Sequence, residues 1–306
     1  MGDLNEKEKF ECFLIGGLGN QIFQHVLLSW IQEYLNKELI LYTSDYSILK
    51  NLYRNFRGIQ PLYFYDWLIK NKKFNNKLIL IKRMKVRIND YFPGFFNGLI
   101  TNKVIGSLDI KKTKKFTDLF AKSYFLKSHC IYPQLLNYKY FYPYWQEIGE
   151  IITENIIKKN QKFEPNVFDL TIHIRKGDYL KGGKNIYAVV TEKYYLKAIK
   201  LIIKKRNFKR RPKCLIIGND INWAKSFLSD ELIDITYQFK SEMLDFYAIS
   251  NCKNLILANS SFSYAAAMVA MLKFDDSLII CPKEYYKGIY KNKYMKNKNW
   301  ITIKND

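Results

Sequence analysis

Side chains suited to binding phosphate follow a short apolar run in the second half of the chain, in the segment His173-Ile174-Arg175-Lys176-Gly177. The guanidinium group of Arg175 offers a planar fork of N–H donors that matches the oxygens of a diphosphate. His173 is expected on the same side of a strand as Arg175, because side chains alternate with period two. Two alternatives stay open: Arg175 fixes a loop by pairing with Asp178, or His173 is purely structural.

Two further polar clusters also follow apolar runs, and each precedes a segment expected to be helical. The first is Gly218-Asn219-Asp220, in which helix capping alone would explain Asp220. The second is Asn259-Ser260-Ser261-Phe262-Ser263. Hydroxyl groups and free backbone N–H groups at a helix N-terminus bind phosphate well. The second cluster holds more small polar residues than a helix cap needs, so we expect it to contact the ligand.

A glycine turn, Gly16-Gly17-Leu18-Gly19-Asn20-Gln21, is the corresponding feature of the first half. It lies between an apolar run at 10–15 and an amphipathic segment at 21–36, which predicts a strand, a turn and a helix. Ile22 stands where the dinucleotide-binding fingerprint needs its last glycine, and the P-loop pattern does not occur. The turn fits neither common nucleotide-binding motif, and the amides of Asn20 and Gln21 suit a sugar or ribose hydroxyl.

The elements that must position these residues alternate between strand and helix in the second half of the chain. Expected strands cover 170–174, 214–217, 233–237, 254–257 and 278–281, and expected helices cover 192–205, 221–228, 242–250 and 262–272. Thr191, Asp220 and Ser241 are the expected N-caps. This alternation predicts a parallel, doubly wound sheet, in which ligands bind outside the carboxyl ends of the strands.

Length and composition predict two domains. The chain has 306 residues, 48% of them hydrophobic, which is ordinary for a globular protein with a large core. A basic, aromatic region at 45–144 and a helix at 144–159 precede a linker at 161–169. We therefore place an N-terminal domain at 1–160 and a C-terminal, ligand-binding domain at 161–306.

Five cysteines without C-x-x-C spacing argue against a disulfide framework or a structural zinc site. Neither a signal peptide nor a transmembrane span of about 20 apolar residues is evident, which favours a cytoplasmic protein. The net charge of +22 favours anionic partners. The stretch Lys287 to Lys298 mixes lysine with tyrosine and suggests contact with an anionic membrane surface, for which a solvated basic face is the alternative. Nucleic acid is not expected, because no nucleic-acid-binding motif accompanies the charge.

The glycine turn at 16–21, the H-x-R-[RK]-G-D-Y pattern at 173–179 and Asn-Ser-Ser-Phe-Ser at 259–263, in this order, resemble family 11 of the glycosyltransferases. Further similarities are found at Tyr194, Tyr195, Asp220, Trp223, Asp245 and the segment 249–252. The chain departs from the family pattern at three places. Lys176 stands in place of a second arginine, Gly218-Asn219 in place of Ser-Asp, and Tyr264 in place of a tryptophan.

The resemblance implies a GT-B fold, in which two Rossmann-like domains face each other across a cleft. It also implies carbohydrate biosynthesis, such as that of O-antigens, by inverting transfer of L-fucose from GDP-fucose to the 2-hydroxyl of a terminal galactose in an oligosaccharide. No metal or other cofactor is expected. The aspartates hold no D-x-D pair, which is the usual cation site of the other major glycosyltransferase fold. The basic charge favours a lipid-linked acceptor at the inner face of the cell membrane.

Arg175 is the expected catalytic residue, because it would stabilise the negative charge that grows on the departing phosphate. The residues expected to bind the donor are Asn20, His173, Arg175, Lys176, Asp220, Asp245, Asn259, Ser260, Ser261 and Phe262. By resemblance Asp245 recognises guanine, with a surface carboxylate as the alternative. Gly19, Asn20 and Gln21 are expected on the acceptor side.

The general base is not identified from the sequence. His25 lies on the helix after the glycine turn, where a histidine is more often packed than catalytic, and the leaving phosphate is an alternative proton acceptor. Another GDP-sugar transferase or a protein O-fucosyltransferase would share the donor site and differ in its acceptor. A non-enzymatic polyanion-binding protein would explain the charge but not the ordered motifs.

Overall fold

The computed structural model describes residues 9–13, 17–42, 104–105, 125–126, 133–158, 168–177, 180, 187–238, 241–287 and 295–306. The chain divides into two compact units, Met1–Ile131 and Tyr132–Asp306, which are described separately. This division falls before the predicted domain boundary at 160, because helix α8 (Tyr142–Lys158) packs on α12 and α13 of the second unit. Within the described ranges, no helix is long and apolar enough to cross a bilayer.

The first unit contains a parallel sheet with strand order β2-β1-β4-β3 among its described residues. These strands are β1 (Lys9–Phe13), β2 (Glu38–Tyr42), β3 (Val104–Ile105) and β4 (Phe125–Leu126). Helix α1 (Leu18–Tyr34) begins within the segment 16–21 that was predicted as a glycine turn, three residues before the predicted start at 21. Most of the predicted aromatic and basic region at 45–144 lies outside the described residues.

The second unit is built on a parallel sheet of six strands in the order β10-β9-β8-β5-β6-β7. They are β5 (Leu170–Ile174), β6 (Lys213–Gly218), β7 (Asp234–Gln238), β8 (Asn254–Ile256), β9 (Leu278–Pro282) and β10 (Ile301–Ile303). The predicted strands are thus confirmed, with ends that shift by one residue. Strand β10 was not predicted, and it lengthens the sheet beyond β9.

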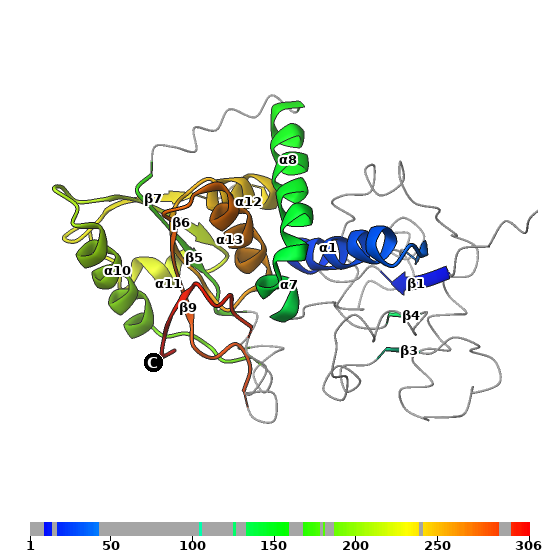
Figure 1. The fold of residues 1–306 in the computed structure, drawn as a ribbon. Helices are drawn as coiled ribbons and strands as arrows, with labels where there is room; N and C mark the ends of the chain where they lie inside the picture. Colours follow the sequence, from blue (N-terminus) through cyan, green and yellow to red (C-terminus); the bar gives the residue numbers. More distant parts are fainter. Residues whose placement is uncertain are drawn as a thin grey trace, which may run out of the picture. The chain divides into compact units, whose positions relative to one another are not determined.

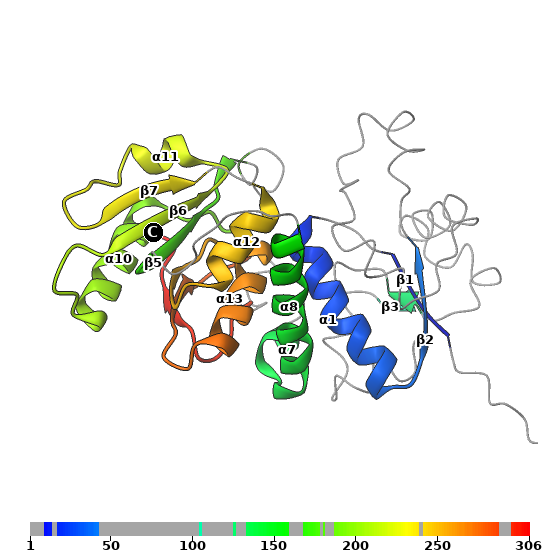
Figure 2. The same ribbon diagram turned by 90° about the horizontal axis from the view of Figure 1, so that it is seen from above.

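Helices of the second unit lie on both faces of this sheet (Figures 1 and 2). The helical segments of this unit are α7 (Pro133–Asn137), η2 (Lys139–Phe141), α8, α10 (Glu192–Arg206), α11 (Ile221–Lys225), α12 (Glu242–Ser250) and α13 (Ser261–Lys273), of which α8 packs on α12 and α13. The predicted helices are confirmed, and α11 ends three residues before the predicted end at 228. The α/β class with parallel sheets is therefore confirmed. The arrangement of two domains across a cleft stays a prediction.

The alternation of side chains along β5 decides what each face of the sheet contacts. Leu170, Ile172 and Ile174 are fully buried in a core shared with Tyr195 and other residues of α10. His173 has the opposite orientation, and its ring lies 5.6 Å from that of Phe262 on α13, measured between centroids. Residues after β5 inherit this alternation, so one neighbour is directed to the α13 side and the next to the α10 side.

Candidate functional site

The candidate site lies at the carboxyl edge of the second sheet, where Arg175 follows β5 and Ser260 follows β8. These strands are direct neighbours, and the Nη1 group of Arg175 donates a hydrogen bond to the hydroxyl of Ser260 at 3.0 Å. Ser260 is fully buried and Arg175 half-buried. Two of the predicted phosphate ligands, 85 residues apart in the chain, therefore meet.

Ser260 is the N-cap residue of α13, but its side chain makes no capping hydrogen bond to that helix. Ser263 instead stabilises the turn, because its hydroxyl donates to the carbonyls of Ala258 and Ser260, both at 3.2 Å. Ser261, the first residue of α13, is half-buried. A guanidinium group thus lies beside the positive end of a helix of 13 residues, an arrangement that favours an anion.

His173 and Phe262, two more predicted donor ligands, lie on the same side as Ser260. His173 is buried, and its backbone carbonyl accepts a hydrogen bond of 3.2 Å from the hydroxyl of Tyr195. Phe262 also contacts Phe246 of α12, with ring centroids 5.8 Å apart. These contacts give His173 and Phe262 packing roles beneath the edge where Arg175 and Ser260 meet.

Asp220, predicted to cap α11 and bind the donor, is bonded to the turn that follows β5. It is the N-cap residue by position, yet its side chain makes no capping hydrogen bond. Its carboxylate accepts from the backbone N–H of Lys176 at 2.7 Å and from that of Gly177 at 3.1 Å. Asp220 therefore fixes the backbone immediately after Arg175.

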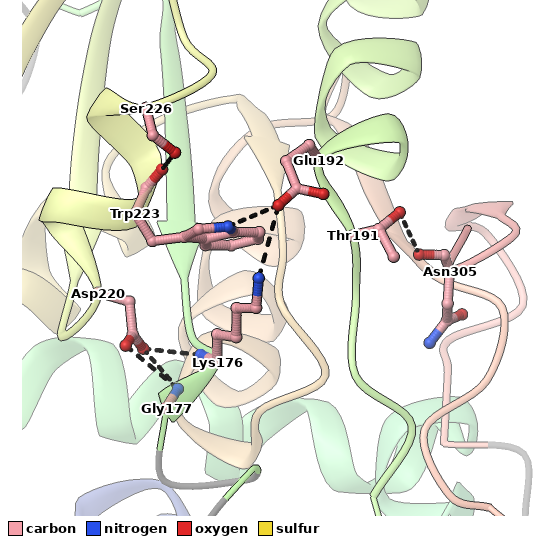
Figure 3. Close-up of polar contacts among 8 residues, drawn as sticks. All are labelled: Lys176, Gly177, Thr191, Glu192, Asp220, Trp223, Ser226 and Asn305. Carbon is pink, nitrogen blue, oxygen red and sulfur yellow. Dashed lines mark hydrogen bonds and ion pairs between the residues drawn. The ribbon is translucent and has the colours of Figure 1, made fainter.

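Alternation along the strand places Lys176 on the opposite side from Arg175. Figure 3 shows the Lys176 side chain directed toward Trp223 and Glu192. Its ammonium group lies 3.9 Å from the ring centroid of Trp223 on α11 and 3.5 Å from Oε1 of Glu192 on α10. The indole N–H of Trp223 donates to the same Oε1 at 2.7 Å. The hydrogen bond from its own backbone, then that from Trp223, and the charge of Lys176 together outweigh desolvation and lower the pKa of Glu192. Glu192 is therefore ionised at neutral pH.

Two glycines allow the loops after β5 and β6 to approach each other. A Cβ at Gly177 would lie 2.8 Å from Oδ1 of Asp220, and a Cβ at Gly218 would lie 1.9 Å from the carbonyl oxygen of Ile174. Gly218 also has φ of +142°, which side-chain-bearing residues rarely adopt. The cluster at 218–220 thus has two structural roles. It lets the backbone after β6 lie close to the backbone after β5, and it leads into α11.

Asn259 is fully buried and joins two loops beside the site. Its amide group donates to the carbonyls of Ala188 and of Tyr285, the latter at 3.3 Å. Tyr187 and Tyr286, next to these carbonyls, form an isolated antiparallel bridge. The predicted donor ligand Asn259 therefore holds the loop after β9 against the chain that leads into α10.

Asp245, expected to recognise guanine, lies in the first half of α12, next to the end of β7. Its Oδ1 accepts a hydrogen bond of 2.8 Å from the side chain of Gln238, the last residue of β7. Ser241 caps α12 by accepting from the backbone N–H of Leu244 at 3.3 Å. Asp245 thus belongs to the same sheet edge as Arg175, two strands away in the order β5-β6-β7.

The residues predicted for the acceptor side belong to the first unit. Gly17 is the N-cap residue of α1, so Gly19, Asn20 and Gln21 all lie in its first turn. Asn20 is half-buried and Gln21 buried. His25 is 2% exposed, and its Nε2 lies 3.4 Å from the hydroxyl of Ser29, which suits a packed histidine. Their roles stay predictions.

The described residues contain no cluster of three or more acidic, histidine or cysteine side chains able to hold a metal ion. Cys214, Cys252 and Cys281 are buried free thiols. Burial raises the pKa of Cys281 to about 12 and that of Cys214 well above its usual value. These thiols are therefore protonated and unsuited to nucleophilic chemistry.

Glu192 and Gln238 are the site residues that sequence reasoning did not identify. An acidic residue in the first helical turn, as Glu192 is, ordinarily complements the helix dipole and attracts no notice. Gln238 ends a strand, the one signal that could have marked it. Asp178, the alternative partner of Arg175, lies outside the described residues.

Comparisons with known proteins matched one family model, two curated relatives and solved structures. The model of Glycosyl transferase family 11 matches residues 3–304. The O-antigen biosynthesis glycosyltransferase WbnK of Escherichia coli is 25% identical, over 96% of this chain and 100% of the relative. An alpha-1,2-colitosyltransferase of Escherichia coli is also 25% identical, over 90% of this chain and 91% of the relative. A solved Arabidopsis thaliana FUT1 mutant in complex with GDP has a TM-score of 0.46 and 12% identity, over 88% of this chain and 70% of that one.

Proposed function

The chain belongs to glycosyl transferase family 11, and we propose that it transfers L-fucose from GDP-fucose to the 2-hydroxyl of a terminal galactose, with inversion at the anomeric carbon. The observation that carries the proposal is the hydrogen bond between Arg175 and Ser260 at the N-terminus of α13. A guanidinium group, a hydroxyl and a helix N-terminus together suit the diphosphate of a nucleotide sugar.

In the proposed reaction the bond between the anomeric carbon and the β-phosphate oxygen breaks as the galactose oxygen attacks from the opposite side. Positive charge develops on the sugar ring, and negative charge grows on the departing phosphate. Arg175 stabilises this negative charge, and removing such a preorganised donor typically costs about 100-fold or more in turnover. The hydroxyl proton leaves to the departing phosphate or to a base that we do not assign.

The remaining donor contacts follow the order of strands along the sheet edge. The diphosphate binds at Arg175, Ser260 and Ser261, near the centre of the sheet. Guanine binds on the β7 side, where a carboxylate such as Asp245 accepts from its ring N–H and amino group. The hydrogen bond from Gln238 holds the Asp245 carboxylate in place for this role. Gly19, Asn20 and Gln21 contact the acceptor.

Other donors and acceptors remain alternatives within the same site. The alpha-1,2-colitosyltransferase relative favours a donor carrying colitose, which lacks one ring hydroxyl of fucose. A protein O-fucosyltransferase would keep the donor site and take a polypeptide acceptor. Turnover with GDP-fucose, GDP-colitose and GDP-mannose, each offered with β-galactosides and with a peptide acceptor, separates these activities.

The donor site is tested by measuring GDP binding calorimetrically and fucosyl transfer to a β-galactoside in EDTA. We expect the wild type to bind GDP and to transfer fucose, and we expect Arg175→Ala to lose both properties. Arg210→Ala is the matched control, because Arg210 is exposed and pairs with Asp169 at the opposite end of the strands. Normal turnover of Arg175→Ala, or strict dependence on added metal, contradicts the proposal.

We also propose that the protein is cytoplasmic and contacts the inner membrane face through a basic–aromatic surface, defined as Tyr138, Lys139, Tyr140, Lys296 and Lys298. Two distant segments form it, because Asn137 donates to the carbonyl of Lys296 at 2.9 Å and accepts from the backbone N–H of Lys298 at 2.7 Å. Tyr138 and Tyr140 are 42% and 41% exposed. Amphipathic rings and lysines of this kind favour a headgroup layer rich in anionic lipid.

A pocket of about 520 Å³ adjoins this surface and is lined by Lys139, Tyr142, Lys298 and Trp300 among others. An anionic headgroup fits its basic rim, although Asp275 also lines it. Most of the predicted basic stretch at 287–298 lies outside the described residues. The proposal of membrane contact therefore rests on the basic–aromatic surface alone.

Sedimentation with vesicles containing phosphatidylglycerol tests the surface. Lys139→Glu with Lys298→Glu should abolish binding, whereas Lys204→Glu with Lys205→Glu, the same change of charge on α10, should reduce it only slightly. Binding of the wild type should fall at high salt. Equal losses in the two variants would indicate a diffuse charge effect and contradict this assignment.

A further inference from the structure

Glu192 is a charged residue at the sheet edge to which the proposed function assigns no role. Its carboxylate lies at the start of α10 and contacts both the ammonium group of Lys176 and the indole N–H of Trp223 (Figure 3). Lys176 directly follows Arg175. Whatever fixes Lys176 therefore restricts the backbone from which the proposed phosphate ligand extends.

We propose that Glu192 is a positioning residue for Arg175, acting through Lys176 and Trp223. The proposal rests on the proposed function of Arg175 as the diphosphate ligand. It also gives Lys176 a different role from the predicted one. The lysine binds no phosphate and serves as the anchor of the turn after β5.

Three consecutive residues of this turn are held by the N-terminal ends of α13 and α10 and by the segment 220–223 that follows β6. Arg175 bonds to Ser260, Lys176 is held by Glu192 and Trp223, and the N–H groups of Lys176 and Gly177 bond to Asp220. Arg175 and Lys176 project to opposite sides of the chain, so each anchor limits rotation that the other alone would allow. With both anchors in place, the guanidinium group is preorganised at the N-terminus of α13 before a ligand binds.

Glu192 is suited to this role and poorly suited to general base catalysis. Its carboxylate is bonded to two donors, and its pKa is lowered by hydrogen bonds and by the nearby ammonium charge. A base with a depressed pKa accepts a proton from a sugar hydroxyl less readily. The indole ring adds a cation–π contact, at 3.9 Å, that holds the lysine in one orientation.

The expected effect is modest, because side chains of Lys176 and Glu192 are 26% and 42% exposed and water screens their attraction. We expect Glu192→Ala to weaken GDP binding about fivefold, as the loss of a partly exposed ion pair and of one indole hydrogen bond would. The GDP affinity of Glu192→Gln should lie between those of the wild type and Glu192→Ala, because its amide oxygen can still accept the hydrogen bond from Trp223. Glu231→Ala is the matched control, since Glu231 is exposed and makes no ion pair among the described residues.

A double-mutant cycle separates positioning from a direct or a merely structural role. In an Arg175→Lys background, which lacks the guanidinium fork, Glu192→Ala should cause less than about twofold further loss of GDP affinity. Equal losses in both backgrounds would show that Glu192 acts independently of Arg175. Tighter GDP binding by Glu192→Ala would show that Lys176 is a phosphate ligand held back by Glu192. Either result overturns the inference.

Amide hydrogen exchange without ligand provides a second readout that does not depend on the donor. Glu192→Ala should accelerate exchange at the N–H groups of Lys176 and Gly177, and Glu231→Ala should not. If this occurs in a protein that fails to bind GDP, the proposed donor is wrong and the positioning role stands. If GDP binds and Arg175→Lys weakens it, but Glu192→Ala changes neither exchange nor affinity, the positioning role alone is wrong.

Discussion

The two sides of strand β5 use charged residues differently. Toward β8, Arg175 and Ser260 present N–H and hydroxyl groups at the N-terminus of α13, where an anion is favoured. On the other side, which we call the β6 side, Asp220 follows β6 and Glu192 begins α10. Their carboxylates bind groups of the protein itself. The β8 side is thus chemically suited to a ligand, and the β6 side holds the turn that carries Arg175.

This difference shows why two adjacent basic residues need not share a role. Arg175 and Lys176 are neighbours in sequence, yet an extended chain directs them to opposite faces. Arg175 binds Ser260 at a helix N-terminus, whereas Lys176 contacts the carboxylate of Glu192 and the indole ring of Trp223. If the comparison is right, changes on the β6 side should first lower stability, and changes on the β8 side should first lower activity.

The largest effect is expected for Gly218→Ala. A Cβ at this position would overlap the carbonyl oxygen of Ile174, and the backbone has φ of +142°. We expect a loss of about 3 kcal/mol or more in the free energy of unfolding, measured by urea denaturation. Gly17→Ala is the control, since a Cβ at Gly17 would have no neighbouring atom within 4 Å. An unchanged Gly218→Ala midpoint would contradict the close approach of β5 and β6.

A smaller loss of stability is expected for Asp220→Ala. The change leaves the N–H groups of Lys176 and Gly177 without their acceptor, which costs about 2 kcal/mol for half-buried groups. Asp220→Asn keeps an acceptor oxygen and should lose less. Thermal unfolding of both variants checks this order. A stable Asp220→Ala that has lost GDP affinity would instead place Asp220 among the donor ligands, as the sequence predicted.

The β8 side was accessible to sequence reasoning, because a parallel sheet brings the carboxyl ends of neighbouring strands together. Arg175 and Ser260 each follow an apolar run, so their proximity could be expected. The helix at 242–250 was predicted with its observed bounds, and Ser241, the expected N-cap, does cap it.

The β6 side was not accessible in the same way. Capping explains Asp220 and the helix dipole explains Glu192, so neither residue conflicts with a purely local role. Their true partners depend on how closely the loops after β5 and β6 approach, which no local pattern encodes. Strand β10 was missed for a similar reason: its three residues are too few to distinguish a period-two pattern, and among the described strands they pair with β9 alone.

On the β8 side, Ser260→Ala should lower activity with little change in stability. The hydroxyl of Ser260 accepts from Arg175 and does not cap α13, so its loss removes a partner of the guanidinium group alone. We expect kcat/KM for fucosyl transfer to fall about tenfold, which corresponds to about 1.4 kcal/mol. Ser226→Ala removes a hydroxyl bonded to the Trp223 carbonyl and serves as control. A large fall in Tm for Ser260→Ala would remove the contrast between the two sides.

The smallest effect concerns the pH dependence of stability on the β6 side. The pKa of Glu192 in the folded protein lies below its ordinary value of 4.5, chiefly through hydrogen bonds from its own backbone and from Trp223. A depressed carboxyl pKa contributes stability above the unfolded-state value, and this contribution disappears as pH falls through the folded-state value.

The difference in the free energy of unfolding between wild type and Glu192→Gln, measured by urea denaturation, should therefore be constant from pH 7 to about pH 5. It should shrink below about pH 4. Its size should stay below about 1 kcal/mol, because the ion pair with Lys176 is partly exposed. Glu231→Gln should show no such pH dependence. A difference that grows on acidification would mean that the pKa of Glu192 is raised in the folded protein. In that case the carboxylate would be destabilised by its surroundings and could not anchor Lys176.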